Sequence, residues 1–423
     1  MAARPTIAIV GGGYAGMAAA LTLTEAGLPP TVFEAGHRLG GRARALPLES
    51  RGQRLDNGQH LLLGAYHATL NMATRLHDTP PWLRLPFDWH LRDRLHLCLP
   101  RLPAPLHSAV GLLTARGLSF SERLATLRLL LGWQQNGFRL AQDQTVAMLL
   151  AGQSPALTEG LWRPLCLAAL NTPIETASAQ VFLNVLQASL AGSARDSDFI
   201  LPTTDLAALL PQPVATRVLA AGGEVHTGHR IRTIQPLQEG FLVDNRHFDH
   251  VICATAPWHV AALFAPHTAL QPMLETVRRL PHAPIATIWL QYPAEVRLPR
   301  PINGLSGTVA QWLFDRGASH GQHGLIAAVV SIPPHDCQAM PLAAAVAAEL
   351  QHAFGLPPPL WTRAVIERRA TFSCEAGLIR PGRKTPLPGL YLAGDYTEGP
   401  YPATLEAAVQ SGVQCADDIL STA

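Results

Sequence analysis

Hydrophobic and polar positions at the start of the chain predict a strand, a helix and a second strand in close succession. The run Thr6–Val10 is apolar and rich in β-branched residues, as expected of a buried parallel strand. An alanine-rich stretch over residues 15–26 has helical character, and Gly27 stands where a helix C-terminus favours glycine. Thr31–Phe33 is a second short β-branched run. This order predicts a βαβ unit that opens a parallel sheet.

The loop between the first strand and the helix has the glycine spacing of a dinucleotide-binding turn. Gly11 permits the tight turn, Gly13 lets the backbone approach a pyrophosphate, and Gly16 lets helix and strand pack closely. The N-terminus of the helix offers unpaired N–H groups and a partial positive charge to the phosphates. Glu34, which closes the second strand, can accept hydrogen bonds from ribose hydroxyls and so disfavours NADP. The predicted contacts of this unit are Gly11, Gly13, Tyr14, Ala15, Gly16 and Glu34.

Two further glycine-containing segments lie near the two ends of the chain. In residues 38–42 the doublet Gly40-Gly41 stands between arginines, so a loop can lie against a pyrophosphate while guanidinium groups neutralise it. Near the other end, a strand over 389–393 leads into Gly394-Asp395. After a Gly-Pro turn, a helix is expected from about residue 403, with apolar positions at helical spacing on one face.

Together these segments resemble the flavin amine oxidase superfamily, in which a glycine doublet follows the opening unit. The resemblance implies FAD as the cofactor. It also implies that residues 55–60 pass under the isoalloxazine ring and that Asp395 binds the ribityl chain. The N-terminus of the last helix would face the flavin edge where negative charge gathers on reduction. The FAD contacts implied outside the opening unit are Gly40, Gly41, Arg42, Gly58, Gln59, Ile231, Gly394, Asp395, Thr404 and Leu405.

The expected fold class is α/β, with a Rossmann-type FAD-binding domain like that of glutathione reductase interleaved with an α+β substrate domain. A chain of 423 residues exceeds the size at which single cores stop growing. The FAD-binding domain is predicted to be discontinuous, from residues 1–74, 206–261 and 366–423. The substrate-binding domain is predicted from residues 75–205 and 262–365.

Local details are most similar to the hydroxysqualene dehydroxylases, FAD-dependent, desaturase-like enzymes of bacterial hopanoid pathways. The similarity lies in residues 39–44, 55–60, 64–66, 392–397 and 401–406. It implies a long-chain isoprenoid substrate and reductive removal of the hydroxyl of hydroxysqualene to give squalene. Two alternatives stay open. One is a carotenoid or polyprenoid desaturase, which transfers hydride in the opposite direction, and the other is a non-catalytic prenyl-lipid escort protein.

Dehydroxylation needs a general acid near the hydroxyl, and the candidate catalytic residues are His60, Asp56 and Tyr401. His60 ordinarily titrates near neutrality and could protonate the leaving hydroxyl, or the segment around it could only hold the flavin. Glu406 is expected to place its charge at the N-terminus of its own helix. Cys374 could attach the flavin covalently, although a buried inert thiol is the simpler interpretation.

The composition of the chain argues against several other kinds of partner and site. The net charge is +2 with no block of like charges, so nucleic acid is not an expected partner. Six cysteines without a CxxC pair and eighteen histidines without HxH or HExxH spacing predict no metal. Amine oxidases of this fold use a buried lysine near the flavin, whereas the only lysine here, Lys384, lies in a turn-like loop. No second nucleotide motif occurs, so the electron donor stays open.

A lipid-resident substrate calls for an apolar entrance, and residues 104–135 are the candidate segment. Ser119 and Glu122 have the spacing of a capping box, and leucines follow beside Arg123 and Arg128. This helix could lie in a membrane interface, basic side toward the headgroups, or pack as an ordinary substrate-domain helix. Residues 1–6 leave no room for a signal peptide. We therefore expect a cytoplasmic protein, peripheral on the inner face of the bacterial cytoplasmic membrane if the helix binds lipid.

Overall fold

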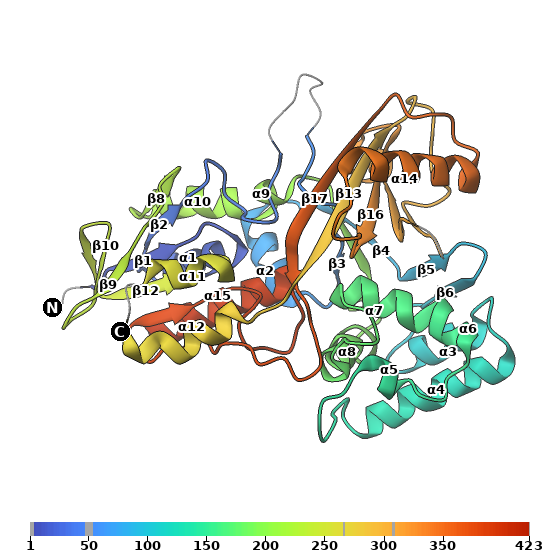
Figure 1. The fold of residues 1–423 in the computed structure, drawn as a ribbon, viewed down its shortest axis with the longest axis horizontal. Helices are drawn as coiled ribbons and strands as arrows, with labels where there is room; N and C mark the ends of the chain where they lie inside the picture. Colours follow the sequence, from blue (N-terminus) through green and yellow to red (C-terminus); the bar gives the residue numbers. More distant parts are fainter. Residues whose placement is uncertain (1–3, 47–53, 265–266, 307–308, 423) are drawn as a thin grey trace.

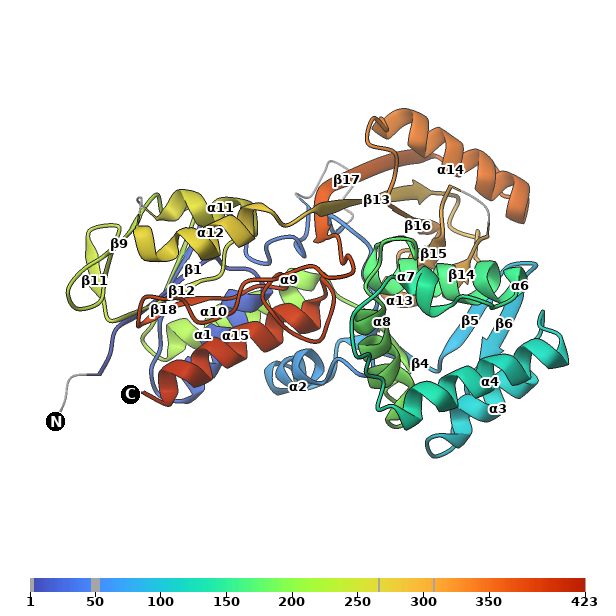
Figure 2. The same cartoon turned by 60° about the horizontal axis from the view of Figure 1, so that its bottom comes forward.

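The computed structural model describes residues 4–46, 54–264, 267–306 and 309–422. Residues 1–3, on which the expectation about a signal peptide partly rests, lie outside these ranges. The described chain forms two lobes that lie side by side, each with a β-sheet of its own (Figures 1 and 2). The long strands β13 and β17 run from the junction of the lobes into the second one (Figure 2).

The first lobe is built on a five-stranded parallel sheet in the order β18-β12-β1-β2-β8. Three separated parts of the chain supply its strands, so distant segments meet side by side. These strands are β1 (Ile7–Val10), β2 (Thr31–Glu34), β8 (Glu224–Thr227), β12 (His250–Cys253) and β18 (Leu390–Leu392). A small antiparallel sheet joins β9 (Ile234–Pro236), β10 (Phe241–Val243) and β11 (Arg246–Phe248). The predicted α/β fold class with a Rossmann-type sheet is confirmed.

Helices surround this parallel sheet. They are α1 (Tyr14–Glu25), α2 (His67–Leu76), α9 (Leu206–Leu209), α10 (Pro211–Ala220), α11 (Pro257–Leu263), the 3₁₀ turn η3 (Thr268–Leu270), α12 (Gln271–Arg278) and α15 (Leu405–Leu420). Helix α1 has Ala26 as its C-cap, and Gly27 follows it as predicted, with a φ of +81°; Leu28 N–H donates to the Leu23 carbonyl. Helices α11 and α12 lie in this lobe in both views, across the predicted limit at residue 261 (Figures 1 and 2). The domain limits themselves stay predictions.

The second lobe contains a seven-stranded, mostly antiparallel sheet in the order β17-β13-β16-β15-β14-β5-β6. Its strands are β5 (Asp88–Leu91), β6 (Leu95–Cys98), β13 (His282–Gln291), β14 (Ile302–Gly304), β15 (Trp312–Asp315), β16 (Leu325–Ser331) and β17 (Trp361–Phe372). A three-stranded sheet joins β3 (Leu62–Leu63), β7 (Phe199–Pro202) and β4 (Trp82–Leu85). The β13–β17 pairing crosses an irregularity between Ala283 and Ile285, near the junction of the lobes.

Helix α14 covers one side of the large sheet, and α3 to α8 gather at the other end of the lobe (Figure 1). The helices of this lobe are α3 (Leu106–Thr114), α4 (Phe120–Gln135), α5 (Val146–Leu149), α6 (Pro155–Leu157), α7 (Arg163–Leu170), α8 (Ala179–Leu186), α13 (Arg316–His320) and α14 (Ala339–Phe354), with the π turns η1 (Thr158–Trp162) and η2 (Gln187–Ala191). Among the described residues, no helix is both long enough and apolar enough to cross a membrane.

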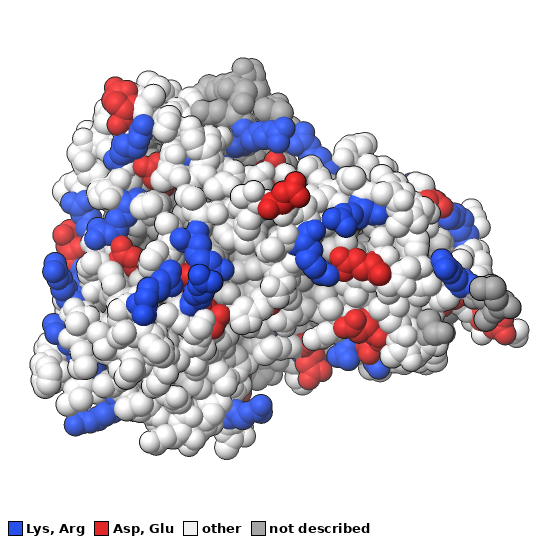
Figure 3. All heavy atoms as spheres, turned by 180° about the vertical axis from the view of Figure 1, so that it is seen from behind, with Lys and Arg blue, Asp and Glu red and all other residues white. Residues whose placement is uncertain are grey.

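The predicted capping box at the start of α4 is present. Ser119 Oγ accepts from Glu122 N–H at 3.3 Å, and Glu122 Oε2 accepts from Ser119 N–H at 2.8 Å. The leucines of α4 are only partly covered, and Leu131 is exposed. On the face seen from behind, acidic and basic side chains are interspersed, with wide uncharged areas between them (Figure 3).

Candidate flavin-binding and catalytic site

The opening turn is packed so tightly that two of its glycines leave no room for a side chain. Gly11 has a φ of +119°, and a Cβ there would lie 2.4 Å from the carbonyl oxygen of Ala254, just after β12. A Cβ on Gly16 would lie 1.9 Å from the Gly11 carbonyl oxygen. Both glycines therefore bring α1 and the ends of two parallel strands together, which aims the N-terminus of α1 at the space above the sheet.

The glycine doublet lies directly against this turn. Gly40 N–H donates to the Gly12 carbonyl at 2.9 Å, and Gly13 faces Gly41. A Cβ on Gly13 would have only the Cα of Gly41 as a neighbour, at 3.9 Å. The space beside Gly13 is thus bare of side chains although the rest of the turn is close-packed. A pyrophosphate fits such a cradle of backbone N–H groups.

Glu34 lies beside the same cradle, at the end of β2. Its Oε2 accepts from Gly12 N–H at 2.8 Å and its Oε1 accepts from Gly36 N–H at 2.7 Å. Each carboxylate oxygen has two lone pairs, so the group keeps capacity for ribose hydroxyls. The backbone contacts fix the orientation in which it would receive them.

The two ends of the chain meet in an ion pair that was not predicted. The guanidinium of Arg42 donates to Asp395 Oδ1 and to the Ala370 carbonyl, the latter at 2.8 Å. Burial is the largest single effect and opposes the charge on Arg42, but Asp395, together with Glu367 and Tyr396, holds the pKa of Arg42 above its usual value. The side chain predicted to neutralise a pyrophosphate thus contacts the carboxylate predicted to bind the ribityl chain. Gly394, just before it, donates its N–H to Ser411 Oγ at 2.8 Å, which fastens this segment to α15.

The last helix begins where the sequence predicted. Thr404 is the N-cap of α15, and its hydroxyl accepts from Ala407 N–H at 3.1 Å, with Leu405 as the first helical residue. Glu406 lies in the first turn of α15, where its charge was expected, but the contacts of its carboxylate were not predicted. Its side chain is fully buried and accepts from the N–H groups of Ala68 and Thr69 at 3.0 and 2.9 Å. The carboxylate therefore caps α2 rather than its own helix, because the first turn of α2 abuts α15.

Glu406→Gln is expected to lower the free energy of unfolding by about 2 kcal/mol. The carboxylate also accepts from Thr69 Oγ1 and from Gln410, so an amide, with a single acceptor oxygen, must leave buried donors unsatisfied. Denaturant unfolding of the FAD-loaded protein measures the loss. Glu275→Gln, on the exposed side of α12, is the matched control and should change stability by less than about 0.5 kcal/mol. Equal stabilities of the Glu406 variant and the wild type would contradict this capping role.

The side chains of Asp56 and His60, four residues apart, contact different neighbours. Asp56 is 4% exposed, its Oδ1 accepts from Leu206 N–H at 3.3 Å, and the hydroxyl of Tyr14 donates to the Leu206 carbonyl at 2.8 Å. Burial raises the pKa of Asp56 to about 7, against the attraction of buried Arg316. Tyr14, predicted as a cofactor contact, thus directs its hydroxyl toward α9.

His60 lies nearer the Arg42–Asp395 pair. Its Nδ1 donates to the Gly58 carbonyl at 2.9 Å, because a carbonyl can only accept. Burial lowers the pKa of His60, and the positive charge of Arg42 acts in the same direction, against the hydrogen bond to Gly58. The ring is therefore neutral near pH 7, with no proton on Nε2. The neighbouring Gln59 donates its N–H to Thr287 Oγ1 of β13 at 3.3 Å, which ties this segment to the second lobe.

Tyr401 pairs with an aromatic residue to which the sequence analysis gave no role. Tyr66 lies edge-on to Tyr401, with ring centroids 6.4 Å apart. Burial raises the pKa of both phenols, and buried Glu406 raises both further. Both hydroxyls therefore keep their protons across the physiological range. The signal that could have found Tyr66 was its position in the Gly64-Ala65-Tyr66 segment just before α2, the helix that Glu406 ties to α15.

The geometry agrees with a comparison to known families. The family model of the flavin-containing amine oxidoreductases matches residues 14–420. The chain belongs to this family. Membership confirms the predicted cofactor, FAD, and the predicted class, an FAD-dependent oxidoreductase. The residues that would hold FAD are those of the glycine cradle, Glu34, and the segment around the Arg42–Asp395 pair.

Relatives within the amine oxidoreductase family share the full length of the chain. It is 30% identical to a hydroxysqualene dehydroxylase of Rhodopseudomonas palustris over 98% of both chains. It is 23% identical to the 15-cis-phytoene desaturase of Solanum lycopersicum, over 99% of this chain and 78% of that one. Cyclohexylamine oxidase from Brevibacterium oxydans has the same fold, with a TM-score of 0.72 at 16% identity over 99% of each chain.

The structure also shows the surroundings of three other residues named in the sequence analysis. Lys384 is 65% exposed and pairs with Asp418 at 3.1 Å, on the surface of the first lobe. Cys374 is 3% exposed, and burial raises the pKa of its thiol to about 12, which favours the inert thiol over a flavin link. Ile231 is buried between β8 and β9.

Proposed function

We propose that this FAD-dependent oxidoreductase acts on a polyprenoid and reductively removes the hydroxyl of hydroxysqualene to give squalene. The observation that carries the proposal is the full-length similarity to the hydroxysqualene dehydroxylase of Rhodopseudomonas palustris. The setting of Lys384, the one lysine of the chain, also supports the proposal. Amine oxidation in this fold would require a buried lysine at the flavin, whereas Lys384 is exposed and paired with Asp418.

The chemistry of this reaction is simple to state. The hydroxyl carbon of hydroxysqualene is allylic, so loss of water after protonation leaves a delocalised cation. Bound FAD, once reduced, supplies the hydride that this carbon accepts. The protein must orient the alcohol, deliver one proton to its oxygen and keep bulk water from the cation.

Among the three candidate acids, Tyr401 suits the task best. A donor needs a proton at working pH, and the raised pKa of Tyr401 keeps its phenol protonated. His60 lacks a proton on Nε2 and can serve as an acceptor or as a support for the flavin. Asp56 has a proton to give near pH 7 but is engaged with α9 and Arg316. Tyr66, beside Tyr401, helps to hold the ring.

Tyr401→Phe is expected to lower kcat about 100-fold while FAD stays bound, because only the proton donor is removed. Stopped-flow measurement of flavin reoxidation by hydroxysqualene gives the rate. Tyr292→Phe is the matched control, since its buried hydroxyl has no partner among the described residues and lies in the core of the second lobe. An unchanged rate in the Tyr401 variant would remove this residue from the mechanism.

The test of the function itself is anaerobic. Photoreduced enzyme is mixed with hydroxysqualene, and the expected result is one squalene formed per flavin reoxidised. The competing function is polyprenoid desaturation, favoured by the similarity to 15-cis-phytoene desaturase. In that case the photoreduced enzyme would yield no squalene. A polyene precursor would instead reduce the oxidised enzyme, and the absorbance of the oxidised flavin would fall.

An apolar face on the second lobe supports contact with lipid. Half of the exposed large apolar side chains of the described residues belong to α3, α4 and the segments beside them; they are Leu102, Leu106, Leu113, Phe120, Leu131 and Met148. Leu106 and Phe120, at the first turns of α3 and α4, are 55% and 71% exposed. Such a surface would let a lipid-resident substrate reach the enzyme without crossing water.

The wild type is expected to float with anionic liposomes. A double variant that combines Leu106→Asp and Phe120→Asp is expected not to float. Removing two large apolar contacts costs about 1.5–3 kcal/mol each, which lowers the membrane partition coefficient at least about 100-fold. Met340→Asp is the control, since Met340 is 85% exposed at the start of α14 and away from this face. A wild type that stays at the bottom of the gradient would refute membrane association.

A further inference from the structure

Four side chains able to bind a metal lie on one face of the β5–β6 hairpin. Strand β6 is the edge of the seven-stranded sheet, and in its register Asp88 lies opposite Cys98 and His90 opposite His96. Since alternate residues of a strand face the same side, these four side chains share one face. The other face carries Trp89, Leu91, Leu95 and Leu97, all buried in the core. The core thus fixes the register that brings the polar groups together.

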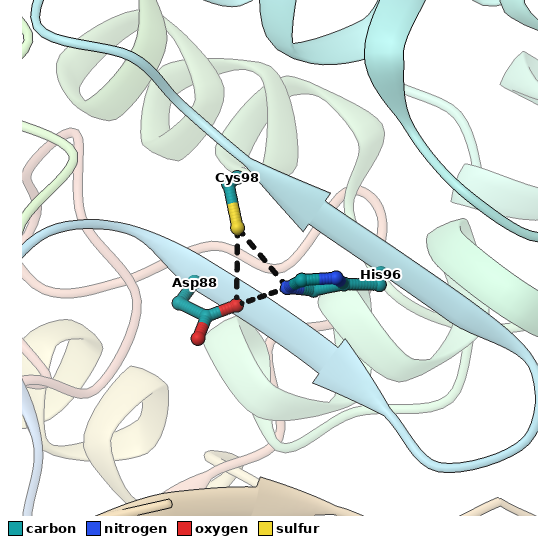
Figure 4. A group of neighbouring side chains, drawn as sticks. All are labelled: Asp88, His96 and Cys98. Carbon is teal, nitrogen blue, oxygen red and sulfur yellow. Dashed lines mark hydrogen bonds and ion pairs between the residues drawn. The ribbon is translucent and has the colours of Figure 1, made fainter.

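Three of these groups converge on one point (Figure 4). His96 Nε2 lies 2.7 Å from Asp88 Oδ1 and 3.1 Å from Cys98 Sγ, and Sγ lies 3.3 Å from the same Oδ1. A nucleophilic Cys-His-Asp triad would use the two ring nitrogens for its two partners. Here a single nitrogen faces both, so proton relay through the ring is ruled out. Convergence of a thiol, an imidazole and a carboxylate is instead the arrangement of a metal site.

We propose that Asp88, His96 and Cys98 bind a zinc-type divalent cation. Sulfur and imidazole nitrogen select zinc-like ions over Mg²⁺ and Ca²⁺, which prefer oxygen ligands alone. Three protein ligands leave a fourth tetrahedral position for water. Zinc bonds of 2.0–2.3 Å place ligand atoms about 3.3–3.8 Å apart, so the groups must separate by roughly half an ångström. Partly exposed side chains on a hairpin allow that movement, and binding releases the thiol proton to solvent.

The surroundings of the cluster suit this assignment. Arg300 Nε donates to Asp88 Oδ2 at 3.1 Å, which orients the carboxylate and leaves Oδ1 for the ion. Cys98 is exposed, so an ion can enter from solvent. The backbone of His96 also pairs with Arg116, in the segment between α3 and α4. A bound ion would therefore link β5 to β6 at the sheet edge that contacts the segment between these two helices. This role is structural and independent of the proposed reaction.

Cobalt substitution in the FAD-loaded enzyme tests the site without measuring activity. After chelator treatment and anaerobic titration with Co²⁺, the expected result is one ion per chain. It should show intense d–d bands at wavelengths beyond the flavin absorption. A thiolate-to-cobalt charge-transfer band should appear in the near ultraviolet, in the difference spectrum against the metal-free, FAD-loaded enzyme. Zn²⁺ should displace the cobalt ion. Cys98→Ser should lose the charge-transfer band, and His96→Gln should weaken binding at least about 100-fold. Cys337→Ser, which alters a thiol elsewhere in the second lobe, should retain both signals.

Folding of each variant is checked by its flavin spectrum, because the cofactor site lies in the other lobe. A second readout is thermal: Zn²⁺ should raise the Tm of the wild type and leave that of Cys98→Ser unchanged. Absence of the charge-transfer band in the wild type, or its survival in Cys98→Ser, would overturn the proposal. Neither result bears on squalene formation, so the two proposals fail separately.

Discussion

Gly13→Ala is expected to leave the protein folded while lowering its affinity for FAD roughly 100-fold. The backbone at Gly13 has a φ of −79° and a ψ of −176°, which alanine adopts without strain. Its Cβ would meet no protein atom closer than 3.9 Å. The methyl group would instead occupy the space proposed for the pyrophosphate. Loss of one or two charge-assisted hydrogen bonds, at about 1.5–3 kcal/mol each, accounts for the magnitude.

Fluorescence titration of the apoprotein with FAD measures this affinity, and circular dichroism checks the fold. Gly132→Ala is the matched control, because it lies on α4 with no atom near its would-be Cβ, and it should bind FAD normally. Gly16→Ala should behave in the opposite way and fail to fold, since its Cβ would collide with the Gly11 carbonyl. Normal FAD affinity in Gly13→Ala would place the pyrophosphate elsewhere.

Asp56→Asn is expected to make the protein more stable at pH 8 by up to about 4 kcal/mol, and no more stable near pH 4. The pKa of Asp56 rises from 3.8 to about 7 on folding because the carboxyl is buried. Between these values the folded protein binds a proton that the unfolded chain has lost. Stability of the wild type therefore falls as pH rises through this window, by about 1.4 kcal/mol for each pKa unit. Asparagine mimics the protonated acid and removes this dependence.

Denaturant unfolding of the wild type and the variant from pH 4 to pH 8, at saturating FAD, measures the difference. Asp93→Asn is the control, since the Asp93 side chain is 87% exposed and its removal should not change the pH dependence. Parallel stability curves for the wild type and Asp56→Asn would mean that Asp56 is ionised throughout. It would then be unable to serve as a proton donor near neutral pH.

The Rossmann unit and its cofactor class could be predicted because they depend on short, contiguous spacings. Backbone geometry at Gly11, Gly16 and Gly27 depends on the glycine itself and a few neighbours, so local sequence is enough. The start of α15 at Thr404 and the capping box at Ser119 are local in the same sense. A few neighbouring residues are enough to determine each of these features.

The contacts that sequence reasoning missed all join residues far apart in the chain. Arg42 meets Asp395, and Glu406 caps a helix that begins at His67, because α15 returns to pack on α2 and on the opening turn. Nothing near Glu406 marks it as a cap for a different helix. The pKa of His60 likewise depends on the folded surroundings, because burial and the charge of Arg42 lower it.

The prediction of no metal stays a prediction, and the proposed site shows what a search by sequence spacing can miss. A search for HxH or HExxH spacing passes over Asp88, His96 and Cys98, because strand pairing rather than helical spacing brings them together. The sequence by itself determined the dinucleotide turn, the FAD class and the likeness to polyprenoid enzymes, since these depend on local glycine spacing and contiguous motifs. Only the tertiary structure decided which side chains meet, which are buried and which keep a proton. Those properties depend on long-range packing and on the desolvation that packing imposes.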